Sequence, residues 1–133
     1  MNRTLWVVQA LVAVVFLVAG ASKLAMPAEV LAASSPLPVL FVRFIGACEI
    51  FGAIGLVVPA VTRIRPMLTP IAAICLAIIM VGATVSTLLV GMGAAALMPF
   101  ILGVAVVFIA YGRLNLAPIA EKTSAIPSLA KQA

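Results

Sequence analysis

Residues 39–61 read VLFVRFIGACEIFGAIGLVVPAV, an apolar run that contains two charged side chains, Arg43 and Glu49. A helix rises 1.5 Å per residue, so a helix of this length matches the roughly 30 Å hydrocarbon core of a bilayer. Small residues around the carboxyl group are typical of a membrane helix that packs closely against other helices. This stretch therefore predicts an integral membrane protein.

Three further apolar runs of similar length lie at residues 5–25, 67–90 and 94–111. They lack the alternating pattern of membrane β-strands, and a helix satisfies its own backbone hydrogen bonds in lipid. The 133-residue chain is 66% hydrophobic and 8% charged, with a mean hydropathy of +1.39, which excludes a soluble monomer. We predict an all-α membrane protein with a four-transmembrane-helix bundle at residues 1–113 and a flexible cytoplasmic tail at 114–133.

The positions of the basic residues predict how the chain is oriented. Six of the eight lie before the first run, between the second and third, or after the fourth: Arg3, Arg63, Arg65, Arg113, Lys122 and Lys131. Because positive residues are retained in the cytoplasm, we expect a multi-pass protein of the inner membrane with both termini cytoplasmic. The net charge of +5 is then explained by basic residues that mark the cytoplasmic side and contact anionic lipid. No nucleic-acid partner is expected. Cleavage of the first run as a secretory signal remains an alternative.

Glu49 is the outstanding polar residue within the predicted spans. An ionisable side chain at the centre of a membrane helix costs about 2.5–3.5 kcal/mol on insertion scales. We expect Glu49 to point into the bundle, either protonated or paired with a cation, because its helical neighbours are mostly small: Ile45, Gly46, Gly52 and Ala53. A functional carboxyl and a purely structural hydrogen bond remain alternatives at this position.

Two cations are candidate partners for Glu49. Lys23 ends the first span, and Arg43 lies about 9 Å before Glu49 along the same helix axis. Alternatively, either cation does not pair with Glu49 and extends its side chain so that the charge lies at the membrane interface. We predict that Glu49, Arg43 and Lys23 are the catalytic residues if the protein is an enzyme.

Further candidate residues share helical faces with these groups. Gln9 and Phe16 lie on the face of the first span that carries Lys23, and Met80, Thr84 and Thr87 share a face of the third. We predict that these five residues bind a ligand in a polar pocket near Glu49, although membrane hydroxyls often bond their own helix instead. No metal site is expected, because the chain has no histidine and its two cysteines lie far apart.

The order and spacing of several short motifs resemble the DoxX-like family of small integral membrane proteins. The resemblance runs from about Leu5 to Arg113 and rests on Leu5-Trp6 with Gln9, Phe16, Gly20 and Lys23; Arg43-Phe44-Ile45-Gly46; Glu49 with Gly52-Ala53-Ile54-Gly55-Leu56; Pro59; Leu68-Thr69-Pro70; Met80 with Gly82-Ala83; and Ala110-Tyr111-Gly112-Arg113. It implies a four-helix bundle loosely associated with quinone-linked redox systems. Family members often carry a histidine where this chain has Thr87.

Three functions remain open. The first is an accessory subunit of a membrane oxidoreductase that binds a lipophilic quinone-like molecule and has no covalently bound cofactor. The second is a cofactor-free enzyme in which Glu49 acts as acid or base on an apolar substrate, in isomerisation, epoxide opening or cyclisation. The third is transport of a small solute or a structural role. A homodimer is expected for transport, since four spans are few for a transporter.

Overall fold

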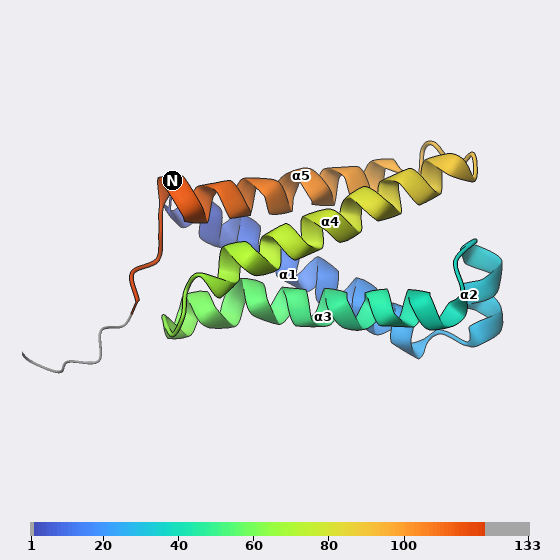
Figure 1. Cartoon of the computed structure of the whole chain (residues 1–133), viewed down its shortest axis with the longest axis horizontal. Coiled ribbons are helices and arrows are strands. Elements are labelled where there is room, and N and C mark those ends of the chain that lie inside the picture. The colour runs from blue at the N-terminus through green and yellow to red at the C-terminus, as the bar shows by residue number, and fades with distance from the viewer. Residues whose placement is uncertain (1, 122–133) are drawn as a thin grey trace, which may run out of the picture.

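The computed structural model describes residues 2–121, and every element in that range is helical (Figure 1). The elements are α1 (Asn2–Ala25), α2 (Ala28–Ser34), α3 (Val39–Thr62), α4 (Leu68–Leu89), α5 (Leu97–Tyr111) and the π-helical segment η1 (Gly112–Leu116). Four helices are long and apolar enough to cross a membrane: α1, α3, α4, and α5 together with η1. The prediction of an all-α protein with four membrane spans is therefore confirmed.

Proline and a left-handed residue set the helix boundaries. Pro27 and Pro38 directly precede α2 and α3. At the start of a helix the fixed φ of proline is compatible with the backbone, and its missing N–H would have no acceptor within the helix. Arg63 ends α3 with φ 57°, and its N–H donates to the carbonyl of Pro59. The short helix α2 therefore lies between the first two spans, outside both.

The last span begins and ends later than the apolar pattern suggested. Its helix starts at Leu97 and continues through η1 to Leu116, where the N–H of Ala117 donates to the carbonyl of Gly112 at 2.7 Å. The segment predicted as a tail therefore begins within a helix, and residues 122–133 lie outside the described range.

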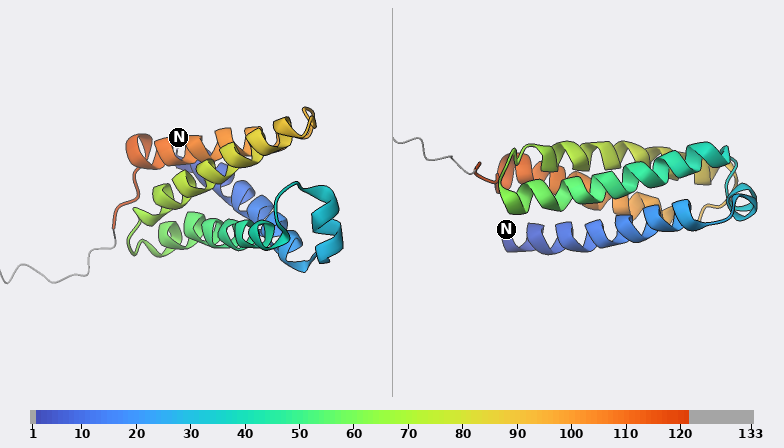
Figure 2. Two further views of the ribbon diagram at one scale, coloured as in Figure 1. Left: turned by 45° about the vertical axis from the view of Figure 1, so that its right-hand side comes forward. Right: turned by 90° about the horizontal axis from the view of Figure 1, so that it is seen from below.

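The four long helices form an antiparallel bundle (Figures 1 and 2). α1 packs against α3 and α5, and α4 packs against α3 and α5. The N-terminus, the α3–α4 loop and the end of η1 lie together at one end of the bundle, which we call the terminal end; α2 and the α4–α5 loop lie at the other, which we call the α2 end. Both described ends of the chain are therefore on one side, while the cytoplasmic assignment of that side stays a prediction.

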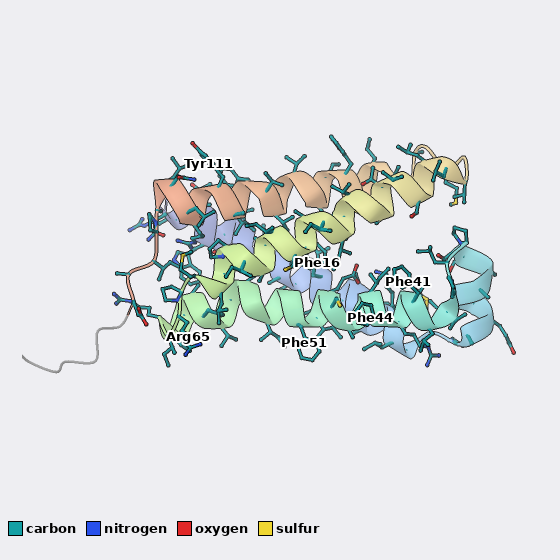
Figure 3. The ribbon with its side chains drawn as sticks, viewed as in Figure 1. Phe16, Phe41, Phe44, Phe51, Arg65 and Tyr111 are labelled. Atoms are coloured by element: carbon teal, nitrogen blue, oxygen red, sulfur yellow. The ribbon has the colours of Figure 1, made fainter. Side chains whose placement is uncertain are left out.

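Large side chains divide between the core and the outer surface. Phe16, Leu56, Leu76 and Val106 are fully buried between the helices. Phe51 is 73% exposed on the outer side of α3, and Figure 3 shows it pointing away from the bundle whereas Phe16 lies inside. An outer surface this apolar is suited to contact with lipid chains.

α1 and α3 approach each other closely at two glycines near the α2 end. A Cβ atom on Gly20 would lie 2.5 Å from the carbonyl oxygen of Gly46 and 2.8 Å from Cγ1 of Ile50. A Cβ atom on Gly46 would lie 2.9 Å from Cβ of Lys23. Only glycine permits this contact, and it brings the residues one turn further along each helix, Lys23 and Glu49, within reach of each other.

Candidate functional site

Lys23 and Glu49 form an ion pair across the interface between α1 and α3. The ammonium of Lys23 donates to both carboxylate oxygens of Glu49, at 2.7 Å to Oε2 and 3.0 Å to Oε1. The side chain of Glu49 is 3% exposed and that of Lys23 is 31% exposed. Lys23 therefore covers the carboxylate and is itself reachable from outside the bundle.

This arrangement limits what Glu49 can do chemically. Both of its oxygens accept hydrogen bonds from one cation, and its side chain is 3% exposed. A molecule that is to touch the carboxylate must first displace the Lys23 ammonium, which would leave an unpaired buried charge. The pair is consistent with a structural contact between helices, and its predicted catalytic role remains untested.

Arg43 does not join this pair. Its Nη2 atom donates to the carbonyl oxygen of Met26 at 3.3 Å, just beyond the C-terminus of α1, where exposed carbonyls favour a cation. Its Nε atom is buried and has no hydrogen-bond partner among the described residues. The three predicted catalytic residues are therefore divided between the partly buried Lys23–Glu49 pair and a separate cation nearer the α2 end.

A second polar cluster lies at the terminal end and is centred on Arg113. This side chain is 3% exposed and donates to Oε1 of Gln9 at 2.9 Å, to Oδ1 of Asn2 at 2.8 Å and to the carbonyl of Ala117 at 3.3 Å. Its guanidinium carbon lies 4.9 Å from the ring centroid of Trp6, a distance that allows a cation–π contact. The cluster ties the last span to the first.

Gln9 bridges three helical elements within this cluster. It is fully buried, it accepts from Arg113, and its amide nitrogen donates to the carbonyl oxygen of Leu56 in α3. Sequence reasoning placed Gln9 among the ligand-binding residues and treated Arg113 only as a marker of topology. Gly112 packs directly against Leu5, so the small residue at this position is a local signal that this end of the chain lies close to α1.

Two clefts lie between α4 and α5, with volumes of about 500 and 410 Å³. The larger is nearer the terminal end and is lined by Ile74, Ala77, Ile78, Val81, Val107, Ala110, Tyr111, Leu114 and Asn115. The smaller is lined by Ala77, Met80, Val81, Thr84, Val85, Pro99, Phe100, Gly103, Val104 and Val107. Both are apolar and open toward the side of the bundle.

The predicted ligand-binding residues are distributed over different parts of the bundle. Met80 and Thr84 line the smaller cleft, whereas Phe16 is 1% exposed in the core. The hydroxyls of Thr84 and Thr87 each donate to a carbonyl of their own helix, at 2.7 Å to Met80 and Ala83 respectively. The structure thus brings Met80 and Thr84 together at a cleft, but it does not direct the two hydroxyls at Glu49.

A protein-family model described as the DoxX-like family matches residues 7–109. The chain belongs to the DoxX-like family. The match covers most of the four spans and confirms the resemblance drawn from the motifs between Leu5 and Arg113. Comparison with curated proteins gave no match, and neither did comparison with solved structures.

Membership of the DoxX-like family accounts for the fold and leaves the chemistry to be argued from the residues. Like its family, this DoxX-like protein is a multi-pass membrane protein with apolar helices. Its ion pair lies between α1 and α3, and its clefts lie between α4 and α5. The ionisable site and the ligand-sized space are thus formed by different helix pairs.

Proposed function

We propose that this DoxX-like protein binds a lipophilic quinone-like molecule between α4 and α5, as an accessory subunit of a membrane redox system in the inner membrane. The observation that carries the proposal is the pair of apolar clefts. Their volumes of about 500 and 410 Å³ fall within the roughly 300–1,000 Å³ of small-molecule sites. Their lateral opening gives a molecule dissolved in the bilayer direct entry.

The polarity of the clefts supports an apolar ligand with few hydrogen-bonding groups. Met80 supplies a flexible, polarisable side chain that adapts to an irregular ring, and it is joined by aliphatic residues on both helices. Thr84, Tyr111 and Asn115 are the polar residues along the lining. In this role the protein holds the quinone, and a partner oxidoreductase supplies the electrons.

The placement of Glu49 makes the cofactor-free enzyme the weaker proposal. Its carboxylate is 3% exposed, is held by Lys23, and does not line either cleft. A general acid or base must come within hydrogen-bond reach of its substrate. We therefore favour the ligand-binding role.

Quinone binding in nanodiscs tests the proposal. Purified protein in phosphatidylcholine nanodiscs is expected to bind decylubiquinone saturably at about one molecule per chain. Val81 and Val107 line both clefts and are 64% and 55% exposed at their rim, so Val81→Phe and Val107→Phe are expected to fill the space without disturbing the core. Each is expected to weaken binding by about tenfold, equivalent to about 1.4 kcal/mol.

The matched control is Val14→Phe, because Val14 is 58% exposed on α1, away from the clefts. It is expected to bind decylubiquinone like the wild type. Absence of saturable binding by the wild type would overturn the proposal, as would equal weakening by all three substitutions. Co-purification of an oxidoreductase with the native protein from its own membranes tests the accessory role separately.

A further inference from the structure

Arg113 is a buried cation whose hydrogen-bond partners are all neutral. Its guanidinium donates to the side chains of Gln9 and Asn2 and to the carbonyl of Ala117, and the ring of Trp6 lies 4.9 Å from its central carbon. Its Nη2 atom is buried and has no hydrogen-bond partner among the described residues. A side chain that is only 3% exposed therefore keeps two N–H groups unused and has no negative charge beside it.

The acidic side chains of the protein do not compensate this charge. The chain has three of them, Glu29, Glu49 and Glu121. Glu49 takes part in the one ion pair found within the described residues, and Glu29 lies on α2, at the opposite end of the bundle. Glu121 is exposed and forms no ion pair with Arg113. Because a buried charge without a counter-charge is costly in a membrane protein, an anion from outside the chain would stabilise this site.

The guanidinium lies directly beneath the surface at the terminal end. Asn2 is exposed and Ala117 is half-buried, and both accept from Nη1, which forms one edge of the planar group together with Nη2. Such an edge binds two oxygens of one phosphate, in shorter and stronger hydrogen bonds than neutral acceptors form. A phosphate that displaces the Asn2 side chain and the Ala117 carbonyl would therefore satisfy Nη2 and supply the negative charge.

The position of the cluster along the spans favours a lipid headgroup as the source of that phosphate. Asn2 begins α1 and Ala117 follows the last residue of η1, so both lie where the apolar spans end and the headgroup region begins. Trp6 is typical of the same level of the bilayer, and the adjoining Val7 and Leu114 are exposed apolar residues suited to acyl chains. Three further exposed cations that attract anionic lipid lie at this end (Figures 1 and 3): Arg3, Arg63 and Arg65.

We propose that Arg113 binds the phosphate of a net-anionic phospholipid at the terminal end, between the first turn of α1 and the end of η1. Phosphatidylglycerol supplies the counter-charge that the site needs, whereas phosphatidylcholine carries a cation of its own beside its phosphate. Arg113 thus recognises a lipid in addition to joining the last span to the first. The inference depends neither on the clefts between α4 and α5 nor on quinone binding.

Quenching by brominated lipids tests this inference, because Trp6 is the one tryptophan in the chain and contacts Arg113. The protein is reconstituted in phosphatidylcholine vesicles in which a fixed fraction of the lipid is dibrominated phosphatidylglycerol or dibrominated phosphatidylcholine. At equal mole fraction the phosphatidylglycerol is expected to quench Trp6 more strongly, corresponding to an affinity about tenfold higher. Equal quenching by the two lipids would overturn the inference.

Two substitutions that remove one positive charge each separate this site from a general effect of surface charge. Arg113→Gln is expected to abolish the preference for phosphatidylglycerol. Arg65→Gln, at an exposed position of the same end, is expected to retain most of it. An equal loss in the two variants would overturn the site, since any basic residue at this end would then serve.

Asn2→Asp tests the site even if Arg113→Gln does not fold. It places a carboxylate where Oδ1 of Asn2 lies 2.8 Å from Nη1, so the counter-charge comes from within the chain, and the preference is expected to disappear while the fold stays intact. Thr4→Asp, at an exposed position of the same turn, is the matched control and is expected to keep the preference. An unchanged preference in Asn2→Asp would overturn the inference. Loss of the wild-type preference in inorganic phosphate, but not in chloride of equal ionic strength, would assign the site to soluble phosphate and overturn the lipid.

Discussion

Lys23 and Glu49 differ in what each could do if its partner were removed. Lys23 is partly exposed near the α2 end, so in Glu49→Gln its ammonium can turn outward toward the interface. Glu49 is sealed, so Lys23→Met leaves a carboxyl with no cation beside it. We expect Lys23→Met to lower stability by about 3–5 kcal/mol and Glu49→Gln to lower it by less.

Unfolding in sodium dodecyl sulfate, followed by circular dichroism, measures this difference. The double variant Lys23→Met/Glu49→Gln is expected to recover most of the stability lost in Lys23→Met, because it leaves no buried charge. A larger loss in Glu49→Gln than in Lys23→Met would contradict the asymmetry of the pair.

Arg113 depends on the fork geometry of its guanidinium. Its Nε and Nη1 atoms reach Gln9 and Asn2 at the same time, and a lysine ammonium cannot reproduce that arrangement. Arg113→Lys is therefore expected to destabilise the bundle by about 1–3 kcal/mol, whereas Arg3→Lys at an exposed position serves as the charge-matched control and is expected to be neutral. Equal thermal stability of the two variants would show that the cluster contributes little.

Lys23 and Arg113 differ in how far the sequence predicted their positions. Lys23 was a candidate partner for Glu49 because it ends a neighbouring span on the face that carries Gln9 and Phe16. The burial of Arg113 was not predicted, because a basic residue after the last apolar run has the pattern of an exposed topology signal. Its position depends on the π-helical segment η1. The apolar pattern of the sequence does not indicate where the backbone hydrogen bonds change to this spacing.

At the scale of helices, the contact between α1 and α3 depends on Gly20. Gly20→Ala places a methyl group against the backbone of Gly46, so the helices must separate, at a cost of about 1–3 kcal/mol. Gly82→Ala on α4 is the control, since nothing lies within 4 Å of the added carbon, and its better helix propensity is expected to leave stability equal or slightly raised. The same detergent unfolding assay compares the two, and equal effects would contradict the close crossing.

The apolar pattern predicted the spans but not the side-chain partners across them. Length and hydropathy identify a helix that crosses a bilayer, because the hydrocarbon thickness imposes both. The hydroxyls of Thr84 and Thr87 share a face as predicted, yet each bonds within its own helix, a local choice that periodicity does not specify. The two clefts depend on how α4 and α5 pack against each other, which the pattern of either helix alone does not determine.

At the scale of the whole molecule, the positive-inside rule gives an orientation that can be measured. After Cys48 and Cys75 are replaced by alanine, Met92→Cys in the α4–α5 loop is expected to react with an impermeant maleimide added outside spheroplasts. Ile64→Cys in the α3–α4 loop is expected to react only after permeabilisation. Both positions are more than half exposed, and the reverse pattern would invert the topology.

The central claim is that a quinone-like molecule occupies the clefts between α4 and α5. The most direct measurement is photolabelling of the protein in nanodiscs with a photoreactive quinone, followed by peptide mass spectrometry. We expect label on residues 74–85 and 99–115, which line the clefts, and we expect an excess of unlabelled quinone to remove it. Displaceable label on α1 and α3 near Lys23 and Glu49, or label that unlabelled quinone does not displace, would contradict the claim.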